Sequence, residues 1–282
     1  MMNYKDIAKQ FKTKKRLGQN FLIDKNVLAT IVDTSNPQKD ETIVEIGPGV
    51  GFVSRLIAEK CNKLIAIELD TDAVSYLNNL SIPNLEVINA DVLNVQLKDI
   101  VDTPVKIVAN IPYYITTPIL VHLLGEIEDI NYSNRELISE ITLMVQKEVA
   151  NRLVASSDSK NKEWGATSIL AQYWSEIEYI TTVSPNSFYP KPKVESAILK
   201  FKVRKQPLVN VKDPKILRKI VKASFNFRRK TLKNALCLSG VSQDIVNDVF
   251  ENLNLPANVR GESLSIDQLA QLADEMSQLT NN

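Results

Sequence analysis

The residues best suited to chemistry follow an apolar run and combine an amide, a proline and aromatic rings. The run at 105–109 is followed by Asn110, Ile111, Pro112, Tyr113 and Tyr114. Proline stiffens the backbone, removes a donor and biases the preceding residue towards an extended conformation. The segment is therefore predicted to end a buried strand at a pocket. Its amide, carbonyl and aromatic groups suit a flat heterocycle that carries an exocyclic amine.

A glycine turn and two carboxylates are placed for a ligand at the same edge. Residues 47–51 read Gly-Pro-Gly-Val-Gly after an apolar run, Glu68 ends the next run, and Asp91 follows the third. In open parallel sheets, ligands lie outside the carboxyl ends of the strands. We expect Glu68 to accept hydrogen bonds from ribose hydroxyls and Asp91 to accept one from an adenine amino group, with Gly47 bringing the backbone close to the ligand.

Two ligands compete for this site, a dinucleotide and S-adenosylmethionine. The glycines alternate, and this differs from the GxGxxG spacing that places a pyrophosphate on a helix N-terminus. Glu45 precedes the turn, where its carboxylate would repel a pyrophosphate but suit an ammonium or sulfonium charge. The pattern favours S-adenosylmethionine and keeps a dinucleotide as the alternative.

Basic residues are concentrated in two segments, although the net charge is only +1. Residues 5–25 hold seven Lys or Arg against two acids, and residues 191–233 hold fifteen against two. Two such segments indicate a surface that binds a polyanion. The alternative for either segment alone is a solvated charged helix.

The composition, with 44% hydrophobic and 24% charged residues, is that of a soluble globular protein of one large or two modest domains. No apolar run approaches membrane-spanning length, and the Lys-rich N-terminus lacks the apolar core of a secretory signal. Cys61 and Cys237 fit no metal or redox spacing. We expect a cytoplasmic protein with no membrane partner and no metal.

The elements that must position these residues alternate between strands and helices, which indicates a doubly wound, mostly parallel α/β sheet. The first two helices are expected at about 24–34 and from 52. The last two strands have a short connection and are expected to be antiparallel. After a linker at 206–214, four apolar stripes at helical spacing predict a small all-α domain. We therefore predict domains at 1–205 and 206–282. The seven expected strands are 42–46, 63–67, 85–89, 105–109, 141–145, 177–183 and 194–203.

Five segments, in order, resemble motifs of the rRNA adenine N6,N6-dimethyltransferases, and the last resembles the basic helix of the small-subunit branch. The resemblance covers the chain from Lys14 to its end. The segments are 18–22 (GQNFL), 110–113 (NIPY), 144–150 (MVQKEVA), 188–196 (FYPKPKVES) and 227–234 (FRRKTLKN).

This resemblance implies a Rossmann-like class I methyltransferase fold and a reaction. Methyl groups from S-adenosylmethionine would pass to N6 of two adjacent adenosines in a hairpin near the 3′ end of 16S rRNA, with a further role in ribosome biogenesis. Tyr113 and Phe188 would sandwich the target base. The donor would contact Asn20, Leu22, Gly47, Glu68, Asp91 and Asn110. Arg228, Arg229, Lys230 and Lys233 would bind RNA phosphates, together with the basic N-terminal arm.

The chemistry expected is positioning rather than general-base catalysis. Hydrogen bonds from N6 to the Asn110 side-chain oxygen and the Ile111 carbonyl would localise the nitrogen lone pair and aim it at the methyl group. No strong base is needed, because the nitrogen becomes acidic once alkylated. We expect His122, the only histidine, to be structural.

Three other functions stay open: a large-subunit rRNA adenine methyltransferase, an assembly or transcription factor that has lost catalysis, and a DNA adenine methyltransferase. The basic 228–230 segment speaks against the first, and the intact Asn-Ile-Pro-Tyr segment with Glu68 and Asp91 speaks against the second. Phosphate contacts do not exclude the third. The expected partner is small-subunit rRNA in a pre-ribosomal particle, bound by a monomer.

Overall fold

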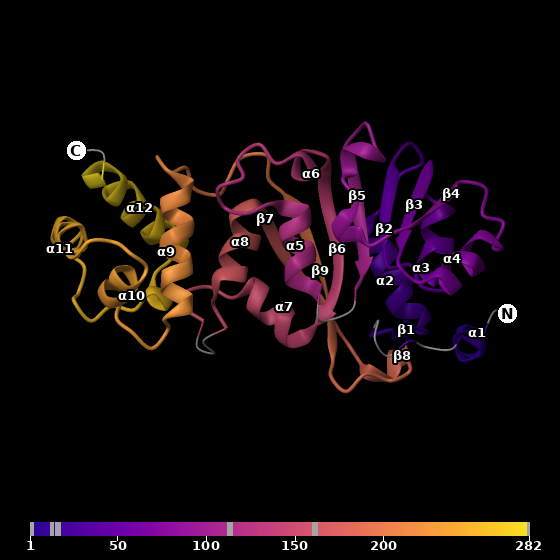
Figure 1. Ribbon diagram of the computed structural model, residues 1–282. Helices are drawn as coiled ribbons and strands as arrows, with labels where there is room; N and C mark the ends of the chain where they lie inside the picture. Colours follow the sequence, from indigo (N-terminus) through magenta and orange to yellow (C-terminus); the bar gives the residue numbers. More distant parts are fainter. Residues whose placement is uncertain (1–2, 12–13, 15–17, 112–114, 160–162, 281–282) are drawn as a thin grey trace. The chain divides into compact units, whose positions relative to one another are not determined.

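The computed structural model describes residues 3–11, 14, 18–111, 115–159 and 163–280, and its chain divides into two compact units (Figure 1). The first comprises Met1–Leu124, Ser133–Ala150 and Glu176–Val203, and the second comprises Gly125–Tyr132, Asn151–Ser175 and Arg204–Asn282. Two internal segments thus pack with the C-terminal helices, whereas the sequence assigned them to the first domain. The predicted domain boundary at 205/206 stays a prediction.

A seven-stranded sheet forms the centre of the first unit, in the order β4-β3-β2-β5-β6-β9-β7 (Figure 1). The pairs from β4 to β6 are parallel, and β9 runs antiparallel to β6. The predicted mostly parallel α/β sheet is therefore confirmed. The strands are β2 (Thr42–Ile46), β3 (Lys63–Glu68), β4 (Leu85–Asn89), β5 (Val105–Asn110), β6 (Ile138–Gln146), β7 (Ser175–Val183) and β9 (Ser196–Val203).

A second, two-stranded ribbon was missing from the sequence prediction. It joins β1 (Phe21–Leu22) to β8 (Phe188–Tyr189), which pair antiparallel although they lie far apart in the chain. β8 falls within the loop that was expected between the last two strands.

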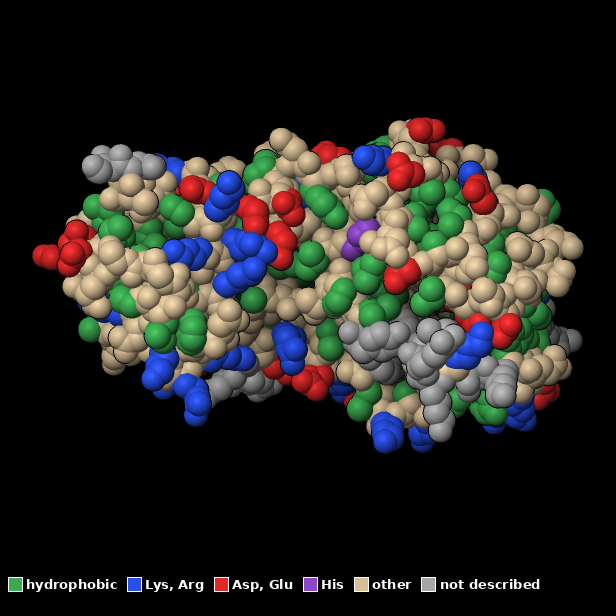
Figure 2. Space-filling model, in the orientation of Figure 1, with side chains coloured by type: hydrophobic (Ala, Val, Ile, Leu, Met, Phe, Trp, Pro, Cys, Tyr) green, Lys and Arg blue, Asp and Glu red, His purple; other side chains and the backbone are tan. Residues whose placement is uncertain are grey.

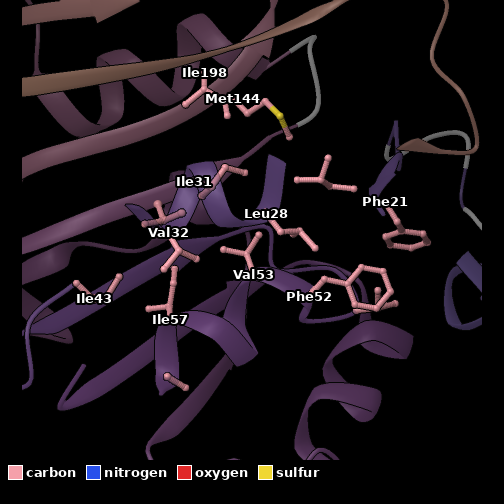
Figure 3. Packing of buried hydrophobic residues seen from close by; sticks show 14 of the residues in the cluster. Phe21, Leu28, Ile31, Val32, Ile43, Phe52, Val53, Ile57, Met144 and Ile198 are labelled. Carbon is pink, nitrogen blue, oxygen red and sulfur yellow. The ribbon is translucent and has the colours of Figure 1, made fainter. Parts of the chain in front are cut away.

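The helices of this unit follow the apolar periodicity of the sequence. Asp24 caps α2, because its side chain accepts a hydrogen bond from the Asn26 amide at 3.0 Å. α2 and α3 bury their apolar sides in one cluster with Ile43, Met144 and Ile198 of the sheet (Figure 3). The helices are α1 (Tyr4–Gln10), α2 (Lys25–Ser35), α3 (Phe52–Ala58), α4 (Thr71–Asn78), α5 (Thr116–Leu124), α6 (Ser133–Glu136) and the start of α7 (Lys147–Val154).

The second unit is helical, and its C-terminal helices match the four predicted stripes. α9 begins at Pro214 under an Asp213 cap, whose side chain accepts from the Lys215 amide at 2.8 Å. Ser224 of α9 lies so close to Gly261 that a Cβ there would come within 2.2 Å of its side chain, so this packing requires glycine. The unit contains α8 (Ala166–Trp174), α9 (Pro214–Asn226), α10 (Leu232–Leu238), α11 (Gln243–Asn252) and α12 (Ile266–Thr280).

Two negative findings concern the described residues only. None of their helices combines the length and apolar character needed to cross a bilayer. Their His, Cys, Asp and Glu side chains form no group of three or more that could hold a metal ion.

Candidate active site

A pocket opens where β2, β3 and β5 end side by side. Ile46 at the end of β2 pairs with Ile67 of β3 and Ala109 of β5, so the residues that follow the three strands meet at one edge. All the described residues that the sequence proposed for donor and base contacts line this one pocket. They are Asn20, Leu22, Gly47, Glu68, Asp91, Asn110, Ile111 and Phe188. Pro112, Tyr113 and Tyr114 lie outside the described residues.

The turn after β2 has a backbone that favours glycine. Gly47 and Gly49 have φ values of +69° and +56°, in the left-handed region. The Gly47 amide donates to the Ile67 carbonyl at 3.0 Å, which ties the turn to β3. A Cβ on Gly49 would lie 3.1 Å from the Phe21 ring, so a larger residue would press on the pocket wall as well as strain the backbone.

Glu68 holds the turn while facing the pocket. It is only 7% exposed, and its two oxygens accept from the Gly49 amide at 2.9 Å and the Asp70 amide at 2.8 Å. Burial raises the pKa of its carboxyl, and the two hydrogen bonds oppose that rise. The side chain is thus fixed in orientation before any ligand binds.

Asp91 is held in a similar way but by a different element. Its Oδ1 accepts from the Leu93 amide at 3.0 Å and caps a short 3₁₀ helix, Val92–Asn94. No hydrogen bond from the described residues reaches its second oxygen, Oδ2.

Glu45 lies deepest of the pocket carboxylates. It is 3% exposed, and its Oε2 accepts from the Ser54 hydroxyl at 2.6 Å. Burial raises the pKa of its carboxyl to about 7, against the opposing Ser54 hydrogen bond and with a small contribution from Glu68. A buried carboxylate with one neutral partner would be stabilised by a cation bound in the pocket.

The charge of the pocket discriminates between the two candidate ligands. Its described lining contains Glu45, Glu68 and Asp91 but no Lys, Arg or His. A pyrophosphate would meet only negative side chains, whereas the sulfonium and ammonium groups of S-adenosylmethionine would meet compensating ones. The residues present therefore fit S-adenosylmethionine and do not fit a dinucleotide.

The Asn110 amide is available to a substrate. It is partly exposed at the end of β5, and no group among the described residues hydrogen-bonds its side chain. Ile111 is buried beside it.

The β1–β8 ribbon joins the two sides of the pocket. Leu22, expected near the donor, pairs with Phe188, expected against the base. The Ile23 amide donates to the Ser187 carbonyl at 2.8 Å, and the Ser187 hydroxyl donates to Asp24 at 2.9 Å. A displacement of one side would therefore disturb the other.

Sequence reasoning missed the contacts that hold Lys14 and Gln19, of which Gln19 lines the pocket. The Gln19 side-chain amide donates to Asp70 at 2.7 Å and accepts from the Lys14 backbone amide at 2.8 Å. The Lys14 ammonium pairs with Asp70 and with Asp72. Burial raises the pKa of Asp70, but the hydrogen bonds from Lys14 and Gln19 outweigh it and lower the pKa overall. The sequence offers no signal for this contact beyond the presence of Gln19 in the motif at 18–22.

Comparison with known proteins decides the family. The pattern of the family described as ribosomal RNA adenine dimethylase matches residues 10–278. The chain belongs to the ribosomal RNA adenine dimethylase family. It is therefore a methyltransferase, and the recognised resemblance is confirmed.

Curated relatives in this family match nearly the whole chain. A protein of Alkaliphilus metalliredigens named Ribosomal RNA small subunit methyltransferase A is 41% identical over 95% of this chain and 93% of its own length. One of Clostridium botulinum with the same name is 39% identical, over 97% and 98%.

Two solved structures share the fold. The 23S rRNA methyltransferase ErmE superposes with a TM-score of 0.69 at 26% identity, over 92% of this chain and all of that one. A dimethyladenosine transferase from Plasmodium falciparum superposes with a TM-score of 0.73 at 22% identity, over 90% and 96%. The predicted class I methyltransferase fold is confirmed.

The basic 228–230 segment differs from its prediction as a helix. α9 ends at Asn226 and α10 begins after a Thr231 cap, so Arg228, Arg229 and Lys230 lie in the turn between them. Phe227 is the C-cap of α9, and its backbone has left the helical region at φ −115° and ψ 41°.

The four proposed RNA-binding side chains are not equivalent. The Arg228 guanidinium donates to Glu262 at 2.9 Å and to the Trp164 carbonyl at 3.2 Å. Lys233 donates to Asn247 at 3.2 Å and lies 4.9 Å from the centroid of the Phe250 ring. Arg229 and Lys230 are exposed and form no ion pair with the described residues.

His122 is not among the described residues that line the pocket, and its Nε2 lies 2.8 Å from the Val95 carbonyl oxygen.

Proposed function

We propose that this protein transfers methyl groups from S-adenosylmethionine to N6 of two adjacent adenosines in a hairpin near the 3′ end of small-subunit rRNA, forming N6,N6-dimethyladenosine. The observation that carries the proposal is the single acid-lined pocket that gathers eight proposed contact residues from six separate segments of the chain. The curated relatives named as small-subunit methyltransferases support this choice of RNA.

The donor would lie along the carboxyl ends of β2, β3 and β4. Glu68 would accept from the ribose hydroxyls, Asp91 Oδ2 from the adenine amino group, and Gly47 would let the backbone approach. Asn20 and Leu22 would close the pocket from the N-terminal side. The bound donor supplies an electrophilic methyl group on its sulfonium sulfur.

The target adenine would enter beside Asn110. Its N6 would donate to the Asn110 side-chain oxygen and to the Ile111 carbonyl, so the lone pair would be free to form the new N–C bond as the methyl–sulfur bond of the donor breaks and the thioether product is left. Phe188 would stack on the flipped base, opposite Tyr113. The N6 proton would leave to solvent after alkylation, and no protein base is required.

The particle bound would be a pre-ribosomal small subunit, met by a monomer in the cytoplasm. Exposed Arg229 and Lys230 would contact RNA phosphates. Arg228 and Lys233 would act mainly by holding the surrounding helices, because each already has protein partners. An enzyme that stays bound to an immature subunit would also delay its maturation, which is the proposed role in biogenesis.

One experiment separates this function from its alternatives. Methyl-labelled donor is supplied with undermethylated small subunits, free large-subunit rRNA and DNA in parallel. Label confined to small-subunit rRNA is expected. Label on DNA or large-subunit rRNA would contradict the proposal, and no label on any substrate would favour a factor that has lost catalysis.

A further inference from the structure

A second, small cavity lies beside Asn110, between the sheet and the helices α2 and α3. Its volume is about 10 Å³, which is about the room that one water molecule requires. Glu45, Val53 and Asn110 line both this cavity and the acid-lined pocket, so the two are neighbours. The cavity lining consists of Ile31, Glu45, Val53, Val108, Ala109, Asn110, Thr142 and Met144.

The strand register places the polar side chains of this lining on the same face of the sheet. Side chains alternate along a strand, so Asn110 shares a face with Val108, which packs in the cluster with α2 and α3. Val108 in turn pairs with Thr142 of β6. Glu45 faces α3, because it accepts from Ser54 of that helix. Glu45, Asn110 and Thr142 therefore meet at the cavity from the neighbouring strands β2, β5 and β6.

Two of these polar side chains are buried and have hydrogen-bonding capacity to spare. Thr142 is 3% exposed, and its hydroxyl bonds to none of the described residues. Glu45 is as deeply buried; one of its oxygens accepts from Ser54, and no described residue reaches the other. Figure 3 shows Ile31 and Met144, two of the apolar side chains that complete the lining. Because buried polar groups are rarely left without a partner, one water between Thr142 and Glu45 would satisfy both.

The Asn110 amide has two ends of opposite chemistry. Its oxygen accepts hydrogen bonds and its nitrogen donates them. The proposed reaction needs the oxygen on the side of the target N6, which leaves the nitrogen to a partner elsewhere. A water that donates one hydrogen to the Glu45 carboxylate and the other to the Thr142 hydroxyl oxygen can only accept from the amide. Such a water would select the orientation that the reaction needs.

We propose that Glu45 and Thr142 are positioning residues, which hold a water that accepts from the Asn110 side-chain nitrogen and so turns the amide oxygen toward the target amine. This rests on the proposed function, because it concerns the same transfer to N6. The bound donor would strengthen the arrangement, since its positive charge favours the carboxylate form of Glu45. Glu45 is the only titratable group in the described lining of the cavity, and the one histidine, His122, purple in Figure 2, lies outside that lining.

The test measures single-turnover methyl transfer to undermethylated small subunits, with donor and subunits both saturating, and measures donor affinity by separate titration. Thr142→Val removes the hydroxyl and keeps the branched shape, whereas Thr142→Ser keeps a hydroxyl. Thr42→Val is the matched control, because it makes the same change at the start of β2, outside the described lining of both the cavity and the pocket. Thermal melts of the three variants report on folding.

Thr142→Val should slow transfer by about three- to tenfold, the contribution expected of one hydrogen bond, and leave the donor Kd within about twofold of the wild type. Thr142→Ser and Thr42→Val should transfer at close to the wild-type rate. Equal rates for Thr142→Val and the wild type would overturn the proposal. So would a Ser variant as slow as the Val variant, or a loss of donor affinity that accounts for the slower transfer.

A high-resolution crystal structure of the protein distinguishes failure of this proposal from failure of the proposed function. The wild type should show one water within hydrogen-bond distance of Glu45, Thr142 and the Asn110 amide, and Thr142→Val should lose it. A wild-type cavity without water, or a water that does not contact Asn110, would overturn the positioning role. If the water is present but the wild type methylates no small-subunit rRNA, the proposed function fails and the water site stands.

Discussion

The side chains of the pocket differ in burial and in hydrogen-bond partners, and these differences indicate separate roles. Glu68 is oriented by two backbone amides, whereas the Asn110 side chain has no hydrogen-bond partner among the described residues. Glu45 is buried with one neutral hydroxyl partner. We therefore expect Glu68 to hold a ligand in a fixed orientation, the Asn110 amide to contact the substrate, and the protonation of Glu45 to respond to a bound cation.

Replacing Asn110 with alanine should all but abolish transfer and only partly weaken donor binding. The amide oxygen is expected to act on the N6 of the target, and loss of one such positioning group typically costs about 10²–10³ in rate. Single-turnover methylation and donor titration measure the two effects separately. Methylation at a near wild-type rate would show that the amide has no such part.

The protonation state of the Glu45 carboxyl should make the affinity for the methyl donor depend on pH. Its pKa of about 7 means that the side chain is neutral in acid, so affinity for a cationic donor should rise as the pH increases from 6 to 8. Glu45→Gln should remove this dependence. Donor titrations at both pH values test the point, and an equal rise in the Gln variant would assign the effect to another group.

The same carboxyl should also affect stability. A folded pKa raised from 4.5 to about 7 means that its stabilising contribution is complete below pH 4.5 and is lost as the pH rises through 7. Glu45→Gln should therefore increase the free energy of unfolding at pH 8 by on the order of 2 kcal/mol. Denaturant melts of the ligand-free protein at pH 5 and pH 8 measure this difference.

Short elements position much of the pocket wall. The β1–β8 ribbon has two residues per strand, yet it connects Leu22 to Phe188. Lys14 and Gln19, which precede β1 in the chain, both bind Asp70, the N-cap residue of α4. The N-terminal wall of the pocket thus depends on side-chain contacts more than on long strands.

Asp70→Asn should weaken donor binding by roughly three- to tenfold, because it removes the charge that Lys14 and Gln19 share. Asparagine remains a good helix cap, so α4 should stay intact. Asp72→Asn is the matched control. Asp72 is exposed and pairs with Lys14 alone, so its effect on donor Kd should be under about twofold. Equal effects of the two changes would count against this role of Asp70.

The turn between α9 and α10 contains two neighbouring arginines, Arg228 and Arg229, for which we expect different roles. Arg228→Ala should lower the free energy of unfolding by about 1–3 kcal/mol, because it leaves Glu262 and the Trp164 carbonyl without their donor. Arg229→Ala should leave stability unchanged and weaken RNA binding. Thermal melts and RNA titrations of both variants distinguish the roles. The reverse pattern would contradict this division.

Across the whole molecule, the elements with strong local signals were predictable. Apolar runs that end at Asn110, Glu68 and Asp91 revealed the parallel strands and their shared edge. The β1–β8 ribbon was not predictable, because two-residue strands have no periodicity and their pairing joins distant segments. The turn at Arg228 was missed because Arg228, Arg229 and Lys230 are good helix formers and no glycine or proline marks the end of α9.

We expect this enzyme to dimethylate two adjacent adenosines of small-subunit rRNA through Asn110. The most direct test is mass spectrometry of rRNA from undermethylated small subunits after incubation with S-adenosylmethionine and either wild-type protein or Asn110→Ala. The expected result is N6,N6-dimethyladenosine at two neighbouring positions near the 3′ end with the wild type, and unmodified adenosine there with the variant. Modification elsewhere, or the same product from both proteins, would contradict the account.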